Sequence, residues 1–171
     1  MLAIAALIAG CATPARVWTG RTPDRQHVLE IRREAGLDHV LVDGVRRAAY
    51  RGIAAWSIAL ANEHVAFAAR VGGAWVVVRD GHVERARWDG IGELRFADDG
   101  TLVYIAERAG GWHVVRGGTI GPRHTAILAG TLRLAGRHVA YVAQDGARAR
   151  VVVDGTPHET FDGIAQLVLH A

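Results

Sequence analysis

The chain has 171 residues, which suits a single domain with one core, and all 20 of its basic side chains are arginine. The 17 acidic residues leave a formal net charge of only +3. The arginines are scattered along the sequence and form no phosphate-binding stripe, so we expect no nucleic-acid partner. Cys11 is the only cysteine, which excludes a disulfide within the chain.

The first residues, MLAIAALIAGCA, form an apolar run that ends in small residues before Cys11. This run resembles a bacterial lipoprotein signal. The resemblance implies that residues 1–10 are a signal peptide and that the thiol of Cys11 carries a diacylglycerol. The alternative is an ordinary secretory signal, or an apolar tail in which the cysteine is incidental. The run is too short to span a bilayer. Ala12 follows the cysteine, and by resemblance to the sorting rule of enteric bacteria this favours the outer over the inner membrane.

Residues 11–26 contain Thr, Gly and Pro and predict a short tether. The remainder, 27–171, is predicted to be a single domain. Its sequence repeats with a period of 37 residues, which three residue classes keep independently: Gly44, Gly81, Gly118 and Gly155; Phe67, Tyr104 and Tyr141; Trp75 and Trp112. A fixed period of this length is typical of a repeat architecture.

Each repeat predicts four short strands. In the second copy these are WVVVRDG (75–81), VERARWDG (83–90), IGELRFADDG (91–100) and TLVYIAER (101–108). Asp-Gly and Gly-Gly pairs separate them, as tight hairpin turns require. The Asp residues of these pairs are therefore interpreted first as hairpin corners.

The two ends of the domain complement each other. HVLEIRR, beginning at His27, corresponds to a fourth strand alone, whereas the last copy, 149–171, has only the first three strands. We therefore predict an all-β fold, a four-bladed β-propeller closed by the N-terminal strand joining the C-terminal blade. An open β-repeat array that closes by dimerisation is the alternative.

The segments LRFADDGTLVYIA (94–106) and RHVAYVA (137–143), with the VVVDG strand ends, resemble the TolB-type, WD40-like propeller repeat. Asp98 stands where that repeat usually has Pro, and four units are fewer than its usual six or so. The resemblance covers the chain after residue 26. It implies a periplasmic or surface-exposed interaction module. We expect no attached hydrolase domain, and the repeat motif itself predicts fold much better than partners.

The sequence gives little indication of catalytic or metal-binding chemistry. The chain contains no zinc-protease, serine-hydrolase or phosphate-loop motif. His27, His64 and His138 share one repeat position, so we interpret them as structural repetition on different blades. We predict no metal, cofactor or catalytic residue, and an enzyme is less favoured than a binding protein.

One group of residues keeps a functional interpretation. The turn between the second and third predicted strands reads YRGI, WDGI, HTAIL and FDGI in successive repeats. In a closed ring, Asp89 and Asp162 would approach one funnel from opposite sides. The predicted ligand or partner site comprises Tyr50, Arg51, Trp88, Asp89, His124, Phe161 and Asp162.

The sequence thus predicts a lipid-anchored module of the cell envelope that binds or scaffolds a protein or a glycan. Two alternatives stay open: a small hydrolase or lyase that uses the funnel carboxylates, and a purely structural lipoprotein that self-associates.

Lipidation has a direct test. A Cys11→Ser variant lacks the thiol that would take the lipid, so we expect it to leave the membrane fraction, as measured by fractionation of whole cells. Continued partitioning of this variant with membranes would contradict the anchor.

Overall fold

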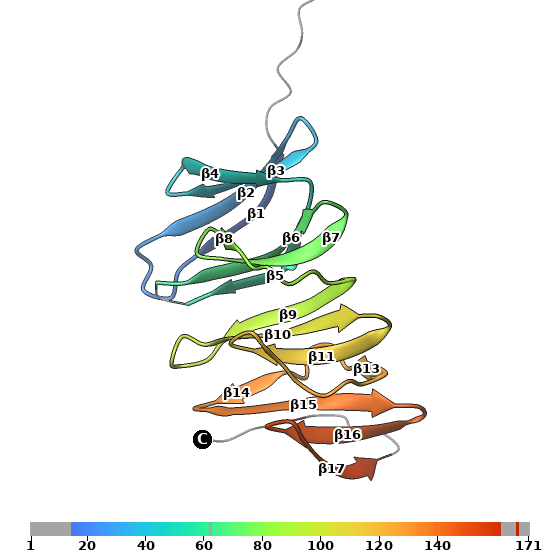
Figure 1. The fold of residues 1–171 in the computed structure, drawn as a ribbon. Coiled ribbons are helices and arrows are strands. Elements are labelled where there is room, and N and C mark those ends of the chain that lie inside the picture. Colours follow the sequence, from blue (N-terminus) through green and yellow to red (C-terminus); the bar gives the residue numbers. More distant parts are fainter. Residues whose placement is uncertain (1–14, 62, 162–166, 168–171) are drawn as a thin grey trace, which may run out of the picture.

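The computed structural model describes residues 15–61, 63–161 and 167. Its strands form four antiparallel sheets that follow one another along the chain and stack face to face (Figure 1). The predicted all-β class and its repeated four-stranded antiparallel sheets are confirmed.

Three of the sheets have four strands each, joined in chain order. The first contains β1 (Ala15–Arg21), β2 (Val28–Glu34), β3 (Leu37–Val42) and β4 (Val45–Tyr50). The second contains β5 (Ile53–Leu60), β6 (Val65–Val71), β7 (Ala74–Arg79) and β8 (His82–Val83). The third contains β9 (Gly90–Phe96), β10 (Leu102–Arg108), β11 (Gly111–Arg116) and β12 (Thr119–Ile120).

The fourth sheet differs at its first strand. Two short strands, β13 (Ala126–Ile127) and β14 (Arg133–Ala135), both pair with β15 (His138–Asp145). The sheet then continues with β16 (Arg148–Val153) and β17 (Thr156–Phe161). The break between β13 and β14 falls at LAGT (128–131), where Gly130 has a positive φ of 74° that favours glycine.

The sheets begin at a different point of the repeat from the one predicted. Part of the expected tether, 11–26, is strand β1, which pairs with β2 from Arg21 opposite Val28 to Ala15 opposite Arg33. The strand after His27 therefore lies between β1 and β3, and both of its edges are paired within the first sheet. The predicted pairing of this strand with the last sheet is not what the structure shows. The first and last sheets lie at opposite ends of the stack (Figure 1).

Apolar clusters hold each sheet to the next. Leu29, Val40 and Phe67 belong to the cluster between the first two sheets. The other two junctions are packed in the same way, by Ala66, Val77 and Tyr104 at the second and by Val103, Val114 and Tyr141 at the third. The core is therefore a column of apolar layers between sheets, and each layer depends on both of its neighbours.

The hairpin turns between the third and fourth strands follow the predicted chemistry. Asp43 and Gly44 have φ values of 51° and 77°, and the pairs that begin at Asp80 and Asp154 match them. Two consecutive positive φ values define the type I′ turn that suits the twist of a hairpin. In the third sheet Gly117 and Gly118 fill the same turn, with φ values of 53° and 86°.

A buried carboxylate joins the first two sheets. The side chain of Asp38 is 1% exposed and accepts two hydrogen bonds from Arg33, at 2.7 and 3.0 Å, and one from the backbone N–H of Ile53 at 2.9 Å. Burial acts to raise the pKa of Asp38, but the bonds from Arg33 and Ile53 outweigh it and the pKa is lowered.

This geometry predicts a pH-dependent loss of stability on substitution. The free energy of unfolding of an Asp38→Asn variant should be about 1–3 kcal/mol lower than that of the wild type at pH 7, because the substitution leaves Arg33 with a neutral partner. The lowered pKa means that the carboxylate stabilises the fold above pH 3.8 and ceases to do so as pH falls through its folded value. Urea unfolding between pH 7 and 3 should show the two proteins converging. Asp98→Asn, at an exposed turn position, is the control and should change little.

Candidate functional site

Three of the residues predicted to form one site, Tyr50, Trp88 and His124, lie at three separate junctions between sheets. Tyr50 packs edge-on against Phe67, Trp88 against Tyr104 and His124 against Tyr141, with ring centroids 5.7, 6.1 and 5.6 Å apart. In each pair the first residue follows or ends the outer strand of one sheet, and the second lies on the second strand of the next sheet. These residues are repeated contacts between sheets.

Trp88 and Asp89 act within this framework. Trp88 is 2% exposed, and the Arg108 guanidinium lies over its ring at 4.2 Å. Asp89 accepts a hydrogen bond of 2.8 Å from the backbone N–H of Ala109, which ties the start of the third sheet to its next turn. Arg51 is exposed beyond the end of β4. Phe161 ends β17, and Asp162 lies outside the described residues, so its approach to Asp89 stays a prediction.

His124 is buried at the third junction. Its Nε2 lies 3.2 Å from the hydroxyl of Tyr141, and its Nδ1 lies 3.5 Å from a carboxylate oxygen of Asp145. Burial, together with the charge of Asp145, raises the pKa of Tyr141 to about 12. The tyrosine therefore stays protonated at neutral pH and keeps its hydroxyl in this contact.

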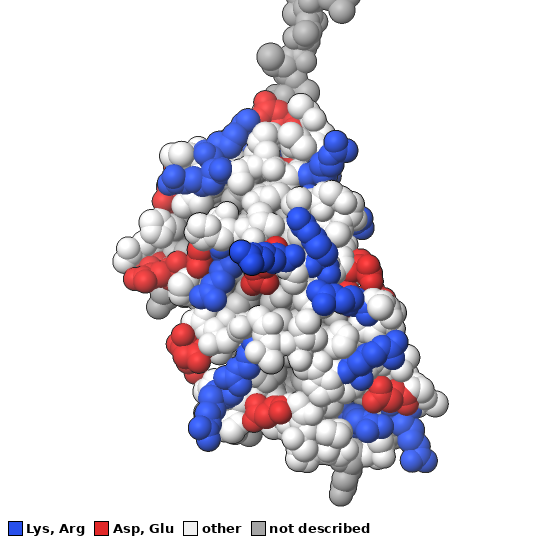
Figure 2. Space-filling model, in the orientation of Figure 1, with Lys and Arg blue, Asp and Glu red and all other residues white. Residues whose placement is uncertain are grey.

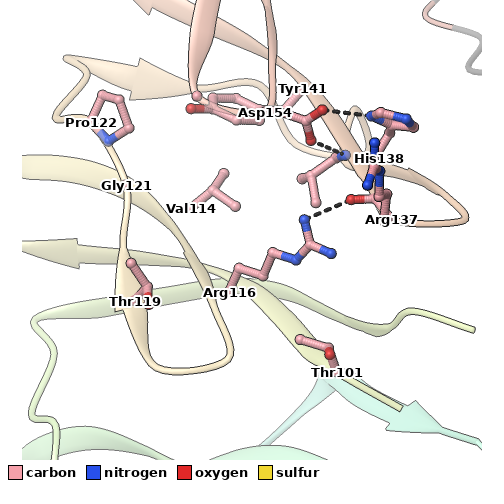
Figure 3. Close-up of a pocket in the computed structure, with 12 residues that line it drawn as sticks. Thr101, Val114, Arg116, Thr119, Gly121, Pro122, Arg137, His138, Tyr141 and Asp154 are labelled. Carbon is pink, nitrogen blue, oxygen red and sulfur yellow. Dashed lines mark hydrogen bonds and ion pairs between the residues drawn. The ribbon is translucent and has the colours of Figure 1, made fainter. Parts of the chain in front are cut away.

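A groove of about 730 Å³ opens beside this pair, between the third and fourth sheets (Figure 3). Its floor is apolar, formed by the buried side chains of Val114, Val139 and Tyr141, and the exposed Pro122 lies at its rim. Polar and charged side chains surround the floor, namely Thr101, Arg116, Thr119, Arg137, His138 and Asp154. An apolar floor with a few polar groups, at this volume, is typical of ligand sites.

Arg116 crosses the groove from the end of β11. Its guanidinium donates a hydrogen bond of 2.6 Å to the backbone carbonyl of Arg137, in the turn before β15 (Figure 3). One repeat earlier, Arg79 donates to the carbonyl of Gly100 at 3.1 Å. The two arginines thus bridge successive sheets in the same way.

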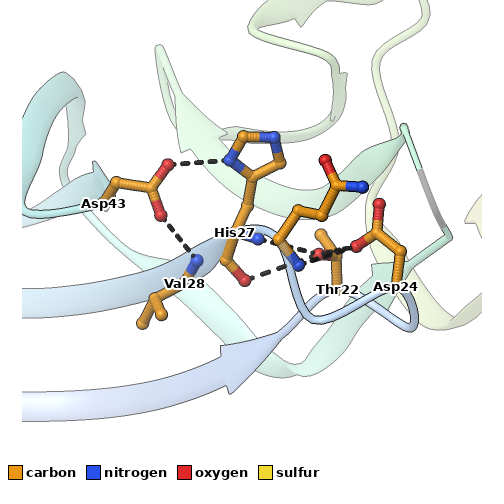
Figure 4. Close-up of polar contacts among 6 residues, drawn as sticks. Thr22, Asp24, His27, Val28 and Asp43 are labelled. Atoms are coloured by element: carbon orange, nitrogen blue, oxygen red, sulfur yellow. Dashed lines mark hydrogen bonds and ion pairs between the residues drawn. The ribbon is translucent and has the colours of Figure 1, made fainter.

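A histidine and an aspartate form the opposite rim. Asp154 accepts from Nδ1 of His138 at 2.6 Å and from the backbone N–H of Val139 at 2.9 Å. The hydrogen bond from His138 is the main cause that lowers the pKa of Asp154. His64 with Asp80 repeats this His-Asp clamp in the second sheet. His27 with Asp43 repeats it in the first sheet (Figure 4). The prediction that these histidines are structural repetition on different sheets is confirmed.

A second groove, of about 510 Å³, lies between the first and second sheets at the equivalent position. Its floor includes Phe67 and Val65, the counterparts of Tyr141 and Val139 two repeats later. Its charged lining differs, with three carboxylates and two basic groups: Asp24, Glu63, Asp80, His27 and Arg47. Equivalent positions of the repeat therefore line both grooves, but the charges of their side chains differ.

Sequence reasoning missed Arg116 and Trp56. The 37-residue spacing of Arg79 and Arg116 was a usable signal, because two equivalent arginines at strand ends indicate a repeated contact. Trp56, on β5, is 71% exposed and borders a hollow of about 500 Å³ with Glu93, Arg95 and Arg133. The alternation of its strand gives no sign of this exposure.

Comparison with known proteins identifies the architecture. No protein-family model and no curated protein matches the chain. Among solved structures, it is similar to the crystal structure of TolB from Acinetobacter baumannii at 15% sequence identity and a TM-score of 0.55. The fold is of the TolB propeller type. The match covers 84% of this chain and 41% of that one, so the chain spans about two fifths of the length of the TolB structure.

In a TolB-type fold each sheet is a blade, so both grooves lie between neighbouring blades. Basic and acidic side chains are interspersed down the face of the molecule seen in Figure 2. Within the described ranges no group of three His, Cys, Asp or Glu residues is placed to hold a metal ion. The same ranges contain no helix long and apolar enough to cross a membrane.

The His-Asp clamp predicts a measurable titration. Asp43, through its hydrogen bond and its charge, raises the pKa of His27 above the ordinary value of 6.5, with a smaller contribution from Asp24. In NMR titrations an Asp43→Asn variant should bring the pKa of His27 back towards 6.5, and Asp24→Asn should lower it less.

The His27–Asp43 pair stabilises the fold over a limited range of pH. The raised pKa of His27 means that the charged pair stabilises the fold below pH 6.5 and that this contribution is lost as pH rises through the folded value. On the acid side it is lost as pH falls through the lowered pKa of Asp43. A His27 pKa that is equal in wild type and Asp43→Asn would contradict the clamp.

Proposed function

We propose that this protein is a lipid-anchored binding module of the cell envelope and that it holds a segment of a partner protein in the groove between its third and fourth sheets. The observation that carries the proposal is the groove itself, with its apolar floor and charged rim. The lipoprotein-like sequence before Cys11 supports the anchor, and the TolB-type fold supports an envelope location. Ala12 after the cysteine favours the outer membrane.

The groove suits a protein segment for a physical reason. Its floor side chains Val114, Val139 and Tyr141 are buried in the fold, so they give a preformed apolar surface at little entropic cost. The rim residues Thr119, Pro122, Arg137 and His138 are exposed and accessible to a partner. Burying apolar side chains on the floor while polar groups contact the rim is the usual anatomy of a protein interface.

A glycan is the second candidate, and Trp56 favours it. This tryptophan is 71% exposed beside a hollow lined by Glu93, Arg95 and Arg133. An exposed aromatic ring with polar neighbours provides a face on which a sugar ring can pack. This second site lies on β5, β9 and β14, and it has no lining residue in common with the groove between the third and fourth sheets.

Crosslinking at the rim tests the proposal. We expect the exposed Arg137→p-benzoylphenylalanine variant, irradiated in intact cells, to form an adduct that includes a second polypeptide. A benzophenone at the rim lies within reach of any chain on the floor. Mass spectrometry of the purified adduct identifies the partner.

The matched control is Val45→p-benzoylphenylalanine, which places the same group at an exposed position on the first sheet. Equal adducts from both positions would indicate random collision and would overturn the groove as the site. Adducts from Trp56→p-benzoylphenylalanine alone, or with carbohydrate only, would favour the glycan site.

A further inference from the structure

The groove between the third and fourth sheets holds an arginine, Arg116, that lacks the adjacent carboxylate found one repeat earlier, and this carries an inference that rests on the proposed function. We propose that Arg116 binds a carboxylate of the partner segment, an Asp or Glu side chain flanked by apolar residues. The apolar neighbours would lie on the floor formed by Val114, Val139 and Tyr141.

The repeat shows what Arg116 lacks. One repeat earlier, Arg79 is followed by Asp80, whose carboxylate lies 3.4 Å from the Arg79 Nε. The residue after Arg116 is Gly117, which keeps the turn but has no carboxylate. Arg116 therefore lacks the adjacent carboxylate that Arg79 has one repeat earlier.

The donors of Arg116 are incompletely used. A guanidinium has five N–H donors, and among the described residues Arg116 donates one hydrogen bond, to the Arg137 carbonyl. Asp154 is the carboxylate that lines this groove; the charge of Arg116 acts on it, but among the described residues no hydrogen bond or ion pair joins the two side chains, and Asp154 accepts from His138 and Val139 instead. The Arg116 guanidinium therefore faces the groove with N–H groups that can pair with a planar carboxylate of a ligand.

The equivalent groove between the first two sheets argues that this charge is specific. There Val42 occupies the position of Arg116, and Glu63 occupies that of Arg137. Asp24 and Asp80 add to the negative charge of that lining. The shared backbone geometry does not itself require a basic groove, so the positive lining at the third junction belongs to its own side chains.

The remaining polar groups fit the same ligand. Thr101 and Thr119 lie on the two sides of Arg116 (Figure 3). Thr101 stands where the other sheets have the clamp histidine; its side chain hydrogen-bonds the neighbouring Asp99, and its hydroxyl can turn to donate to a ligand carboxylate. Third-sheet residues thus supply three donor groups on one wall, opposite the apolar side chains of the fourth sheet.

Two peptides of matched shape test the inference. The acetylated peptide amides LFDL and LFNL differ only in whether the third side chain is a carboxylate or an amide. We expect the full-length protein to bind LFDL about tenfold more tightly than LFNL in calorimetric titrations, because a hydrogen bond to a charged group is stronger than one to a neutral group. In NMR spectra, LFDL should shift the amide signals of Thr101, Thr119 and Val139.

Three variants separate binding from folding. Arg116→Ala should weaken LFDL binding about tenfold, whereas Arg79→Ala removes the equivalent bridge between sheets and should leave binding unchanged. Gly117→Asp restores the repeat's own acid beside Arg116. Asp43 and Asp80 already adopt this φ, and an added Cβ would lie 3.5 Å from a Thr101 methyl group, an ordinary contact. This variant should fold normally and still weaken binding of LFDL.

Three results would contradict different parts of the inference. Equal affinity for LFDL and LFNL would overturn the carboxylate while leaving the groove as a protein-binding site. Unchanged binding in Gly117→Asp, or an equal loss in Arg79→Ala, would overturn the role of Arg116. Failure of both peptides to bind, when 3-phenylpropionate binds and its amide does not, would assign the groove to free carboxylic acids and overturn the protein segment.

Discussion

The structure depends on contact between the apolar faces of successive sheets. A single four-stranded sheet of this chain has apolar side chains on faces that it cannot bury alone, so each sheet is stable only against its neighbours. The edge-on pairs of Tyr50 with Phe67, Trp88 with Tyr104 and His124 with Tyr141 fix where the sheets meet. Aromatic pairs in this geometry stabilise beyond the area they bury.

The first sheet has a neighbour on one face only, and its sequence differs accordingly. The position of Phe67, Tyr104 and Tyr141 is occupied there by Glu30, which pairs with Arg16 at 3.5 Å and with Arg32. A polar residue suits a face at the end of the stack, as in the terminal units of other repeat proteins. The aromatic residue is thus present where one sheet follows another and is replaced where the sheet lies at the end.

The period of 37 residues predicted the sheets, their turns and the aromatic positions, because backbone geometry imposes the same requirements on each copy. It did not show where a sheet begins. ARVWTGR, the sequence of β1, lacks the valine-rich pattern of the central strands, so the sequence pattern predicts a tether there and pairs the next strand with the last sheet. Only the pairing of β1 with β2 reveals that the first sheet is complete in itself.

The predicted site was affected by the same limit. Tyr50, Trp88 and His124 were grouped because they align, but equivalent residues of a repeat are separated by the distance between sheets. Alignment therefore argues for a shared structural role. Positions where one copy departs from the others are better evidence for function, and Gly117 beside Arg116 is such a departure.

That departure has a structural cost that strengthens its interpretation. Three sheets stabilise the start of the second strand with a His-Asp clamp, made by the pairs that end at Asp43, Asp80 and Asp154. The third sheet has Thr101 and Gly117 at these positions and forgoes the clamp. The type I′ turn survives there because Gly117 itself adopts a positive φ, but an unclamped glycine loses more conformational entropy on folding. At this position the third sheet lacks a stabilising contact that the other sheets have, and an arginine without an adjacent carboxylate lies over an apolar floor. Such a loss of stability is typical of binding sites, where stability is exchanged for function.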